Sequence, residues 1–425
     1  MRERAAIRPA PPPPPTLSEA EAILPARIYI NGRFLQQPVT GVQRYARELL
    51  KAWDEMLAAG EIDSRAVEFR VLAPPGPIAP PVLRHISLRQ VGRLRGHLWD
   101  QLELPLRVRD GILFSPCNVH PLLSLFVCPA VVTVHDLAWR LSPDAYTPTF
   151  RLAYRVLVPA ALRRAAAVIT VSEAEKRNII KHFPVVADRI HAVHHGAPAV
   201  ADPFPNGVLS RQSTKFPLCT GGNISLWVGT LTRRKNPQGA IDAIALVNKE
   251  LKLPLVMVGT NYRGFTDAGL TIPHASGEII RFTDRLSTFA ELAGLYRAAA
   301  CLLFPSFYEG FGLPALEAMA HGCPVVASDI AALREVCGDA AVYCNPNEPS
   351  DIARKIRMVV EDSQLRELLR HRGFGRAREF SWKKCARQTL GILRKVVARE
   401  IPGSAHAVDA TPSTHPEAAA EHSST

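Results

Sequence analysis

The sequence predicts an α/β protein in which two parallel β-sheets form two domains of similar size. Short apolar, β-branched runs alternate with helical patterns along most of the chain. These runs are apolar nearly throughout, as strands are when helices cover both faces of a parallel sheet. Residues 197–223 interrupt the alternation with repeated Pro, Gly, Ser and Thr, which is typical of an interdomain linker.

The first domain is expected to span residues 26–196, after a Pro/Ala-rich leader (1–25) that is expected to be disordered. Its apolar runs predict strands at Arg27–Ile30, Glu68–Ala73, Ile112–Ser115, Ala130–His135, Ala167–Val171 and His191–His194. Residues with helical spacing predict helices at Val42–Leu57, Leu98–Val108, Arg151–Arg164 and Glu173–His182.

The second domain is expected to span residues 224–380, followed by a helix at 381–400 and a disordered tail at 401–425. Its predicted strands are Leu226–Val228, Leu255–Val258, Cys301–Phe304, Val325–Ala327 and Ala341–Tyr343. Asn236 and Pro237 are good N-cap and first-turn residues for the helix after the first strand. Because ligands of such sheets bind near the carboxyl ends of the strands, we expect the site in a cleft between the domains.

Composition limits the function classes. With 47% hydrophobic and 21% charged residues, the chain is globular for most of its length. Residues 1–196 hold 25 basic and 17 acidic side chains, and residues 197–425 hold 26 and 22, so the net charge of +12 lies mainly in the first half. This excess fits an anionic partner such as a phosphate or a membrane surface. It is too diffuse to predict nucleic-acid binding.

Cysteines and apolar segments indicate the compartment. The eight cysteines include no C-x-x-C pair, so neither a zinc site nor a disulfide framework is expected. The longest apolar stretch, Leu122–Val134, is too short to span a bilayer, and no signal-peptide core follows the N-terminus. We therefore expect a cytoplasmic protein.

The most informative segment runs from Phe304 to Ser328. Gly310 and Gly312 allow a tight turn after a strand, and Pro314 suits the first turn of the next helix. The amides at Gly312 and Leu313 would then be free donors for a phosphate. Glu309 and Glu317 flank this turn and can accept hydrogen bonds from sugar hydroxyls. A plain glycine loop with solvated glutamates is the structural alternative.

Two further loops carry charged groups at strand ends. After Gly229, the basic loop Arg233, Arg234 and Lys235 could neutralise a pyrophosphate leaving group, although a charged loop is often only solvated. His135 and Asp136 end another apolar strand, where a pair of this kind can bind polar groups or have a purely structural role.

Glycine and serine mark two helix starts. Gly41 begins a predicted helix whose first amides would face the cleft, or it is simply a loop glycine. Ser172 is predicted first as a helix N-cap and only second as a ligand contact.

Together these segments resemble the GT-B-fold retaining glycosyltransferases of family 4, which use nucleotide sugars. The resemblance covers roughly residues 26–400 and is most specific in the Glu-x7-Glu motif from Glu309 to Glu317. It implies an α/β GT-B fold, with two Rossmann-like parallel-sheet domains facing across a cleft. It also implies that the last helix, residues 381–400, crosses back to the N-terminal domain.

The resemblance also implies residue roles. Glu309 would contact the donor sugar and Glu317 the ribose, while His135 would touch the donor sugar. An Arg/Lys pair would bind the pyrophosphate, but many members carry arginine where this chain has Thr230, which leaves the division of labour open. The remaining donor-binding candidates are the amides of the motif and four strand-end or loop residues: Gly310, Phe311, Gly312, Leu313, Gly41, Asp136, Gly229 and Arg233.

We therefore expect a retaining glycosyltransferase that moves a hexose from a nucleotide sugar to a growing saccharide of a bacterial surface polysaccharide. The stretches Trp99–Pro105 and Ser115–Asn118 most resemble O-antigen and exopolysaccharide mannosyltransferases, which favours GDP-mannose. No Asp-x-Asp triplet occurs in the chain, so no metal and no cofactor are expected. A nucleotide-sugar epimerase and a non-catalytic scaffold for glycan assembly are the alternatives.

The stretch Arg84–Arg95 interleaves basic and apolar residues. It could lie against an anionic membrane or a lipid-linked saccharide acceptor, at the inner face of the cytoplasmic membrane. A solvated basic loop is the equally open structural alternative.

Overall fold

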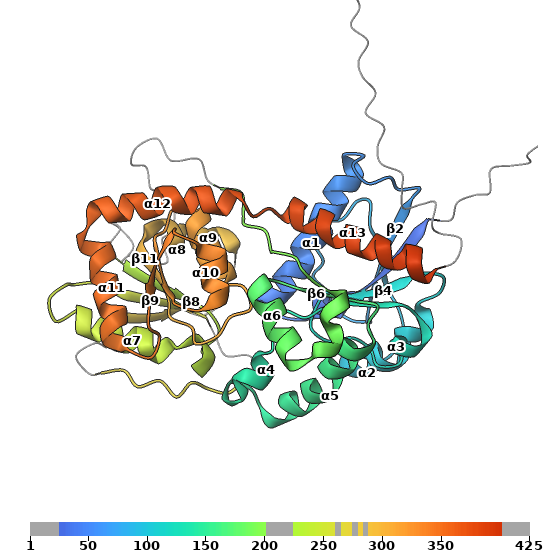
Figure 1. Ribbon diagram of the computed structural model, residues 1–425, viewed down its shortest axis with the longest axis horizontal. Coiled ribbons are helices and arrows are strands. Elements are labelled where there is room, and N and C mark those ends of the chain that lie inside the picture. Colours follow the sequence, from blue (N-terminus) through green and yellow to red (C-terminus); the bar gives the residue numbers. More distant parts are fainter. Residues whose placement is uncertain (1–24, 201–223, 260–264, 274–278, 284–287, 402–425) are drawn as a thin grey trace, which may run out of the picture.

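The computed structural model describes residues 25–200, 224–259, 265–273, 279–283 and 288–401. It contains two parallel sheets, each sandwiched between helices, in two domains that lie side by side (Figure 1). The predicted fold class is confirmed. The leader, the tail and most of the predicted linker lie outside the described residues.

The first sheet has seven strands in the order β3-β2-β1-β4-β5-β6-β7, and all neighbours are parallel. The strand order reverses between β1 and β4, which creates a crevice at the carboxyl ends of these strands. The strands are β1 (Ala26–Asn31), β2 (Val67–Ala73), β3 (Ser87–Gln90), β4 (Ile112–Ser115), β5 (Ala130–Thr133), β6 (Ala167–Thr170) and β7 (Ile190–Ala192).

The second sheet has six parallel strands in the order β10-β9-β8-β11-β12-β13. Here the order reverses between β8 and β11, so the loops that follow these two strands emerge next to each other. The strands are β8 (Ile224–Val228), β9 (Leu255–Val258), β10 (Ile280–Thr283), β11 (Ala299–Phe304), β12 (Val325–Ser328) and β13 (Ala341–Cys344).

Helices cover both faces of the first sheet because successive strand residues point to opposite sides. Ile28, Phe69 and Phe114 pack on one face against α1, and Val132 and Val168 pack on the other against α5 and α6. The helices are α1 (Gly41–Ala58), α2 (Gly96–Leu98), α3 (Ser124–Val127), α4 (Ala138–Leu141), α5 (Pro148–Arg164) and α6 (Glu173–His182), with short turns η1 (Gly32–Gln36), η2 (Trp99–Glu103), η3 (Pro105–Arg107), η4 (Pro143–Ala145) and η5 (Pro184–Arg189).

The last helix, α13, belongs in space to the first domain. Figure 1 shows α12 leading across to α13, which lies along α1. Trp53 is fully buried beneath it and donates its indole N–H to the carbonyl of Ala386 at 2.9 Å. The other helices of the second half of the chain cover the second sheet. In chain order, the helices after the linker are α7 (Pro237–Val247), α8 (Phe289–Ala298), α9 (Leu313–Ala320), α10 (Ala331–Cys337), α11 (Pro349–Glu361), α12 (Ser363–Arg378) and α13 (Trp382–Glu400), with the turn η7 (Arg233–Lys235).

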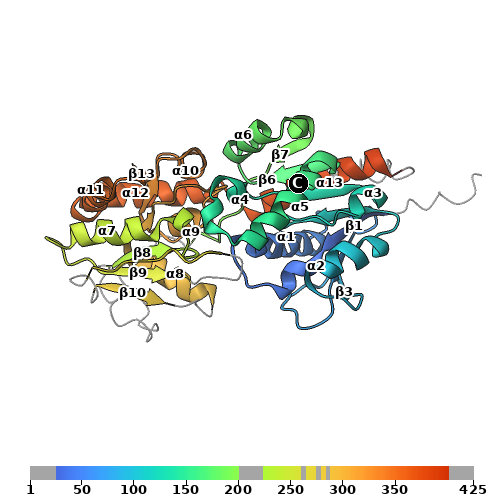
Figure 2. The same ribbon diagram turned by 90° about the horizontal axis from the view of Figure 1, so that it is seen from below.

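The chain passes from one domain to the other at two segments, near Ala197 and near Ser381, and these two segments lie side by side. The amide of Ala197 donates to the carbonyl of Phe380 at 3.1 Å, and Ala197 forms a parallel bridge with Ser381. A Cβ on Gly196 would lie 2.2 Å from the backbone nitrogen of Trp382, so only glycine fits there. Figure 2 shows the same two domains from below.

One prediction of local structure is wrong, and one segment without a predicted element contains a strand. The helix expected at Leu98–Val108 is a succession of α2, the π-turn η2 and the 3-10 turn η3. Pro105 lacks the N–H that a continuous helix needs and lies in the middle of this segment. In the basic stretch Arg84–Arg95, residues Ser87–Gln90 form the edge strand β3. The carboxylate of Asp54 accepts the amides of Arg84, His85 and Ile86, which fixes the start of that strand.

Candidate active site

The loop between β11 and α9 presents the start of a helix. Strand β11 ends at Phe304, and α9 begins at Leu313 with Pro314 in its first turn. Gly312 caps the helix with a φ of 110°, a conformation that residues with a Cβ rarely adopt. The first amides of a helix have no intrahelical partner and lie at its positive end. This turn can therefore bind an anion.

Glu309, in the same loop, holds two cations of the neighbouring turn η7. Its carboxylate accepts from Arg234 Nη1 at 3.3 Å and is ion-paired with Lys235. Arg234 Nη1 also donates to the carbonyl of Tyr308 at 2.8 Å. All three charged side chains are at most 11% exposed. Strands β8 and β11 are neighbours, and this is why their two loops meet here.

Burial and the neighbouring charges shift the pKa values of Glu309, Lys235 and Arg234 in opposite directions. Burial alone would raise the pKa of Glu309, but Lys235 and Arg234 outweigh it and hold that pKa below its ordinary value. Burial lowers the pKa of Lys235, and the charge of Glu309 only partly offsets this effect. Burial also acts to lower the pKa of Arg234, but the negative charge of Glu309 outweighs burial and raises that pKa above its ordinary value. The Nε of Arg234 is buried without a hydrogen-bond partner among the described residues.

Glu317 is buried on α9 and contacts the other domain. Its carboxylate forms an ion pair with Arg44 of α1 and accepts from the hydroxyl of Tyr296 at 3.1 Å. Burial raises the pKa of Glu317, and Arg44 and Tyr296 only partly counter it. The guanidinium of Arg44 also lies 4.0 Å from the centre of the Phe289 ring.

The first domain contributes His135 and Asp136 just after β5. His135 is 5% exposed, and its Nε2 lies 2.8 Å from the carbonyl of Pro116. Because a carbonyl only accepts, Nε2 carries the proton and Nδ1 is left as an acceptor. Burial lowers the pKa of His135 and favours this neutral form. Asp136 accepts from the amide of Ala138, the first residue of α4, at 3.0 Å.

The two domains touch at this point. A Cβ on Gly310 would lie 2.1 Å from the carbonyl oxygen of His135, so glycine is required for the approach. Ser172 Oγ donates to the carbonyl of Gly310 at 2.7 Å and also caps α6 by accepting the amide of Glu175 at 3.0 Å. The predicted N-cap role of Ser172 is therefore confirmed.

Tyr308 makes the second contact across the boundary. Its hydroxyl donates to Glu175 at 2.6 Å and accepts the amide of Leu137 at 3.1 Å. Burial is the main reason that the pKa of Glu175 rises to about 8. This network fixes the loop after His135 against the loop that carries Glu309.

The structure brings most of the predicted residues together. Gly41 lies opposite Leu313. A Cβ on Gly41 would lie 3.7 Å from the Cδ1 methyl group of Leu313. Gly229 follows the end of β8 and lies beside the Lys235 side chain. A Cβ on Gly229 would lie 3.6 Å from Cδ of Lys235. Phe311 differs, because its ring packs in the core 4.8 Å from the ring of His195 and only its backbone is left for a ligand. Arg233 is exposed and does not join Arg234 and Lys235.

Sequence reasoning missed the residues that join the domains. Arg44, Tyr296, Tyr308 and Glu175 were not singled out. Arg44 is three residues from Gly41 and Tyr308 directly precedes Glu309, so both lie in segments that had already drawn attention. Their partners are far away in the sequence, and no local pattern predicts such pairs. Among the described residues there is no cluster of three or more His, Cys, Asp or Glu side chains suited to a metal ion.

Two parallel-sheet domains that meet over a buried Glu-x7-Glu motif define a GT-B glycosyltransferase. Family models agree. Residues 39–199 match Glycosyltransferase Family 4, and residues 222–362 match Glycosyl transferases group 1. The chain belongs to this family of glycosyltransferases.

Individual relatives give the same result. The chain is 34% identical to O-antigen chain mannosyltransferase B of Escherichia coli. The alignment runs over 269 residues and covers 62% of this chain and 70% of the relative. It is 26% identical to O-antigen chain mannosyltransferase RfbU of Salmonella typhimurium, over 75% of this chain and 87% of the relative. Sucrose-phosphate synthase from Thermosynechococcus elongatus has a similar fold, with a TM-score of 0.65, 20% identity and coverage of 88% and 100%.

A separate observation concerns membranes. In the part of the chain that the structure describes, no helix has both the length and the apolar character needed to cross a bilayer.

Proposed function

We propose that this glycosyltransferase transfers mannose from GDP-mannose, with retention of anomeric configuration, to a saccharide acceptor of a bacterial surface polysaccharide. The two bacterial relatives above are named O-antigen mannosyltransferases, which supports the sugar and the polysaccharide. Retention follows from the family resemblance of the Glu309–Glu317 motif.

The observation that carries the proposal is the buried pair of cations on η7. Arg234 and Lys235 share one carboxylate, Glu309, and the Arg234 Nε has no partner among the described residues. A buried N–H without a partner is costly, so this group calls for an acceptor. The diphosphate of a nucleotide sugar supplies acceptor oxygens with the correct charge, and the adjacent start of α9 supplies amide donors.

The proposed reaction places charge where these groups can stabilise it. The bond between the anomeric carbon and the phosphate oxygen breaks, and negative charge develops on the leaving GDP beside Arg234 and Lys235. The acceptor hydroxyl attacks from the same face, and its proton passes to the leaving phosphate. Positioned charges of this kind are worth about a hundred- to a thousandfold in rate each.

The other residues orient the donor. Glu309 accepts from hydroxyls of the transferred sugar, and the unprotonated Nδ1 of neutral His135 can accept another. Glu317 binds the ribose hydroxyls while Arg44 and Tyr296 hold its carboxylate. Gly41, Asp136 and Gly229 shape the donor pocket through their backbone or side chain.

The acceptor and the location are part of the proposal. We propose a lipid-linked acceptor at the cytoplasmic face of a membrane, reached by peripheral contact. Leu98, Leu102 and Leu106 recur every four residues in the described structure and are 62%, 53% and 64% exposed. In the sequence, the three leucines are preceded by Arg93 and Arg95 and followed by Arg107 and Arg109. Exposed leucines flanked by arginines are typical of membrane-surface segments. Co-sedimentation with anionic vesicles should fall when the three leucines are changed to serine.

The donor test uses a panel of GDP-mannose, GDP-glucose, UDP-glucose and UDP-N-acetylglucosamine. Wild type should bind GDP-mannose in preference to the other three donors and transfer its mannose, with and without EDTA. Glu309→Ala and Glu317→Ala should each weaken donor binding or turnover by about a hundredfold. Glu361→Ala, at an exposed residue of α11, is the matched control.

Three outcomes would contradict the proposal. A donor converted to its epimer without any acceptor would identify an epimerase. Absence of binding for every donor, or wild-type behaviour of both glutamate variants, would favour a scaffold. Loss of activity in EDTA would show that a metal is required.

A further inference from the structure

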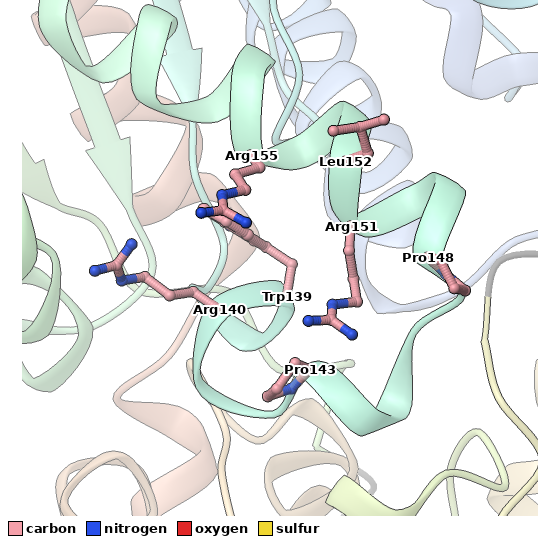
Figure 3. A pocket seen from close by; sticks show the side chains of 7 residues that line it. All are labelled: Trp139, Arg140, Pro143, Pro148, Arg151, Leu152 and Arg155. Atoms are coloured by element: carbon pink, nitrogen blue, oxygen red, sulfur yellow. The ribbon is translucent and has the colours of Figure 1, made fainter.

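A second basic cavity lies in the first domain, outside the donor site. It has a volume of about 440 Å³ and is lined by Trp139 and Arg140 of α4, Pro143 of η4, and Pro148, Arg151, Leu152 and Arg155 of α5. Figure 3 shows Arg151 and Arg155, one turn apart on α5, both extending toward α4. Among the described residues, the lining includes three arginines and no Asp or Glu.

The arginines of this cavity have no acidic partner in the part of the chain that the structure describes. All three are exposed, and none forms an ion pair with another described residue. Arg151 and Arg155 are four residues apart on one helix face, where like charges repel each other. An anion between them would remove this repulsion and bring charge-assisted hydrogen bonds.

The indole of Trp139 forms part of the wall of this cavity. The residue is 6% exposed, and its indole Nε1 is buried without a partner among the described residues. An indole N–H can only donate, and a buried donor without a partner is costly. The resonance of this N–H therefore reports on changes at the cavity wall, while the three arginines are the groups that attract an anion.

The cavity lies beside the donor site. Helix α4 begins two residues after Asp136, and η4 lies against η7, the turn that carries Arg234 and Lys235. The amide of Thr266 in the second domain donates to the carbonyl of Ala145 in η4 at 3.1 Å. A ligand in the cavity is thus held on the first domain at the edge of the interdomain boundary.

We propose that this cavity binds a phosphate or phosphodiester group, separate from the diphosphate of the donor. Its volume falls within the range of ligand sites and exceeds what one phosphate fills, so a further group attached to the phosphate, such as a sugar or an alkyl chain, fits beside Leu152 and Pro148. The phosphate belongs either to a phosphorylated acceptor or to a lipid headgroup. Its position on the acceptor side rests on the proposed function, whereas anion binding itself does not.

The test follows the indole N–H resonances of protein labelled with ¹⁵N in its five tryptophans. The Trp139 resonance is assigned from its absence in Trp139→Phe. Titration with pyrophosphate or glucose 1-phosphate, at constant ionic strength with chloride as control, should shift this resonance saturably. A phosphatidylglycerol vesicle titration forms the third arm.

Matched variants separate the cavity from the donor site. Arg151→Gln/Arg155→Gln should weaken the binding that shifts the Trp139 resonance by roughly ten- to a hundredfold. Arg163→Gln, an exposed arginine at the far end of α5, should leave it unchanged. GDP binding should be the same in all variants, so failure here is distinct from failure of the proposed donor site.

Each outcome decides the proposal. A response to soluble phosphates identifies an acceptor phosphate as the source, and a response to vesicles alone identifies a lipid headgroup. The proposal is overturned if the Trp139 resonance stays in place in all three titrations. It is also overturned if chloride produces the same shift or if the double variant titrates like wild type.

Discussion

Glu175 should make the folded protein less stable as the pH rises, and Glu175→Gln should remove this effect. The side chain is 2% exposed and lies between Tyr308, Asn178 and the amide of Leu137. Burial raises its pKa from 4.5 to about 8. Below pH 4.5 the carboxyl is protonated in both the folded and the unfolded chain, so the full stability is present there.

The magnitude follows from these two pKa values. Between them the folded chain keeps the proton and the unfolded chain releases it, so stability falls by about 1.4 kcal/mol per pH unit. The total loss on passing through pH 8 is about 5 kcal/mol, and the hydrogen bonds from Tyr308 and Asn178 keep it from being larger. A glutamine keeps an acceptor at this position and does not titrate.

Urea unfolding followed by tryptophan fluorescence at pH 5, 6.5 and 8 measures this difference. The free energy of unfolding of wild type should fall relative to that of Glu175→Gln as the pH rises. Glu173→Gln, an exposed change on the same helix, should run parallel to wild type. A constant difference between wild type and Glu175→Gln across this pH range would refute the reasoning.

Two further changes probe the contact between the domains. Gly310→Ala puts a methyl group against the carbonyl of His135 and should lower kcat/KM about a hundredfold, because a small misplacement of reacting groups is that costly. Gly375→Ala in α12, where a Cβ meets nothing within 4 Å, should leave the kinetics unchanged, and equal effects of the two changes would contradict this account. Arg44→Gln leaves Glu317 as a buried carboxylate without a cation, which typically costs about 3–5 kcal/mol of stability. Because the raised pKa of Glu317 favours its protonated form, this cost, measured by urea unfolding, should grow from pH 5 to pH 8, and a cost that shrinks would exclude the ion pair.

Most of the fold could be predicted from the sequence because local patterns determine it. Apolar strands, cap residues such as Asn236 and Ser172, and the proline and glycine around α9 each leave a mark within a few residues. The edge strands β3 and β10 were not predicted. Each has polar, exposed positions, as edge strands often do, and carries no apolar run.

The candidate site could be predicted only where it is local. Glu309, Glu317 and the basic loop were found from spacing and from the family resemblance. The ion pair of Arg44 with Glu317 joins residues 273 positions apart, and the Tyr308–Glu175 bond spans 133. Such pairs arise from the docking of two domains, about which residue spacing says nothing. The inward position of Arg234 and Lys235 and the outward position of Arg233 likewise depend on the neighbouring strand β11.

The most direct test of the donor site compares the three cations of one turn. Calorimetric titration with GDP should show Arg234→Gln and Lys235→Gln weakened by roughly ten- to a hundredfold, because each loses a charge-assisted hydrogen bond to the diphosphate. Arg233→Gln, at the exposed residue next to them, should bind GDP like wild type. If Arg233→Gln weakens GDP binding as much as the other two changes, or if none of the three does, the diphosphate does not bind where this account places it.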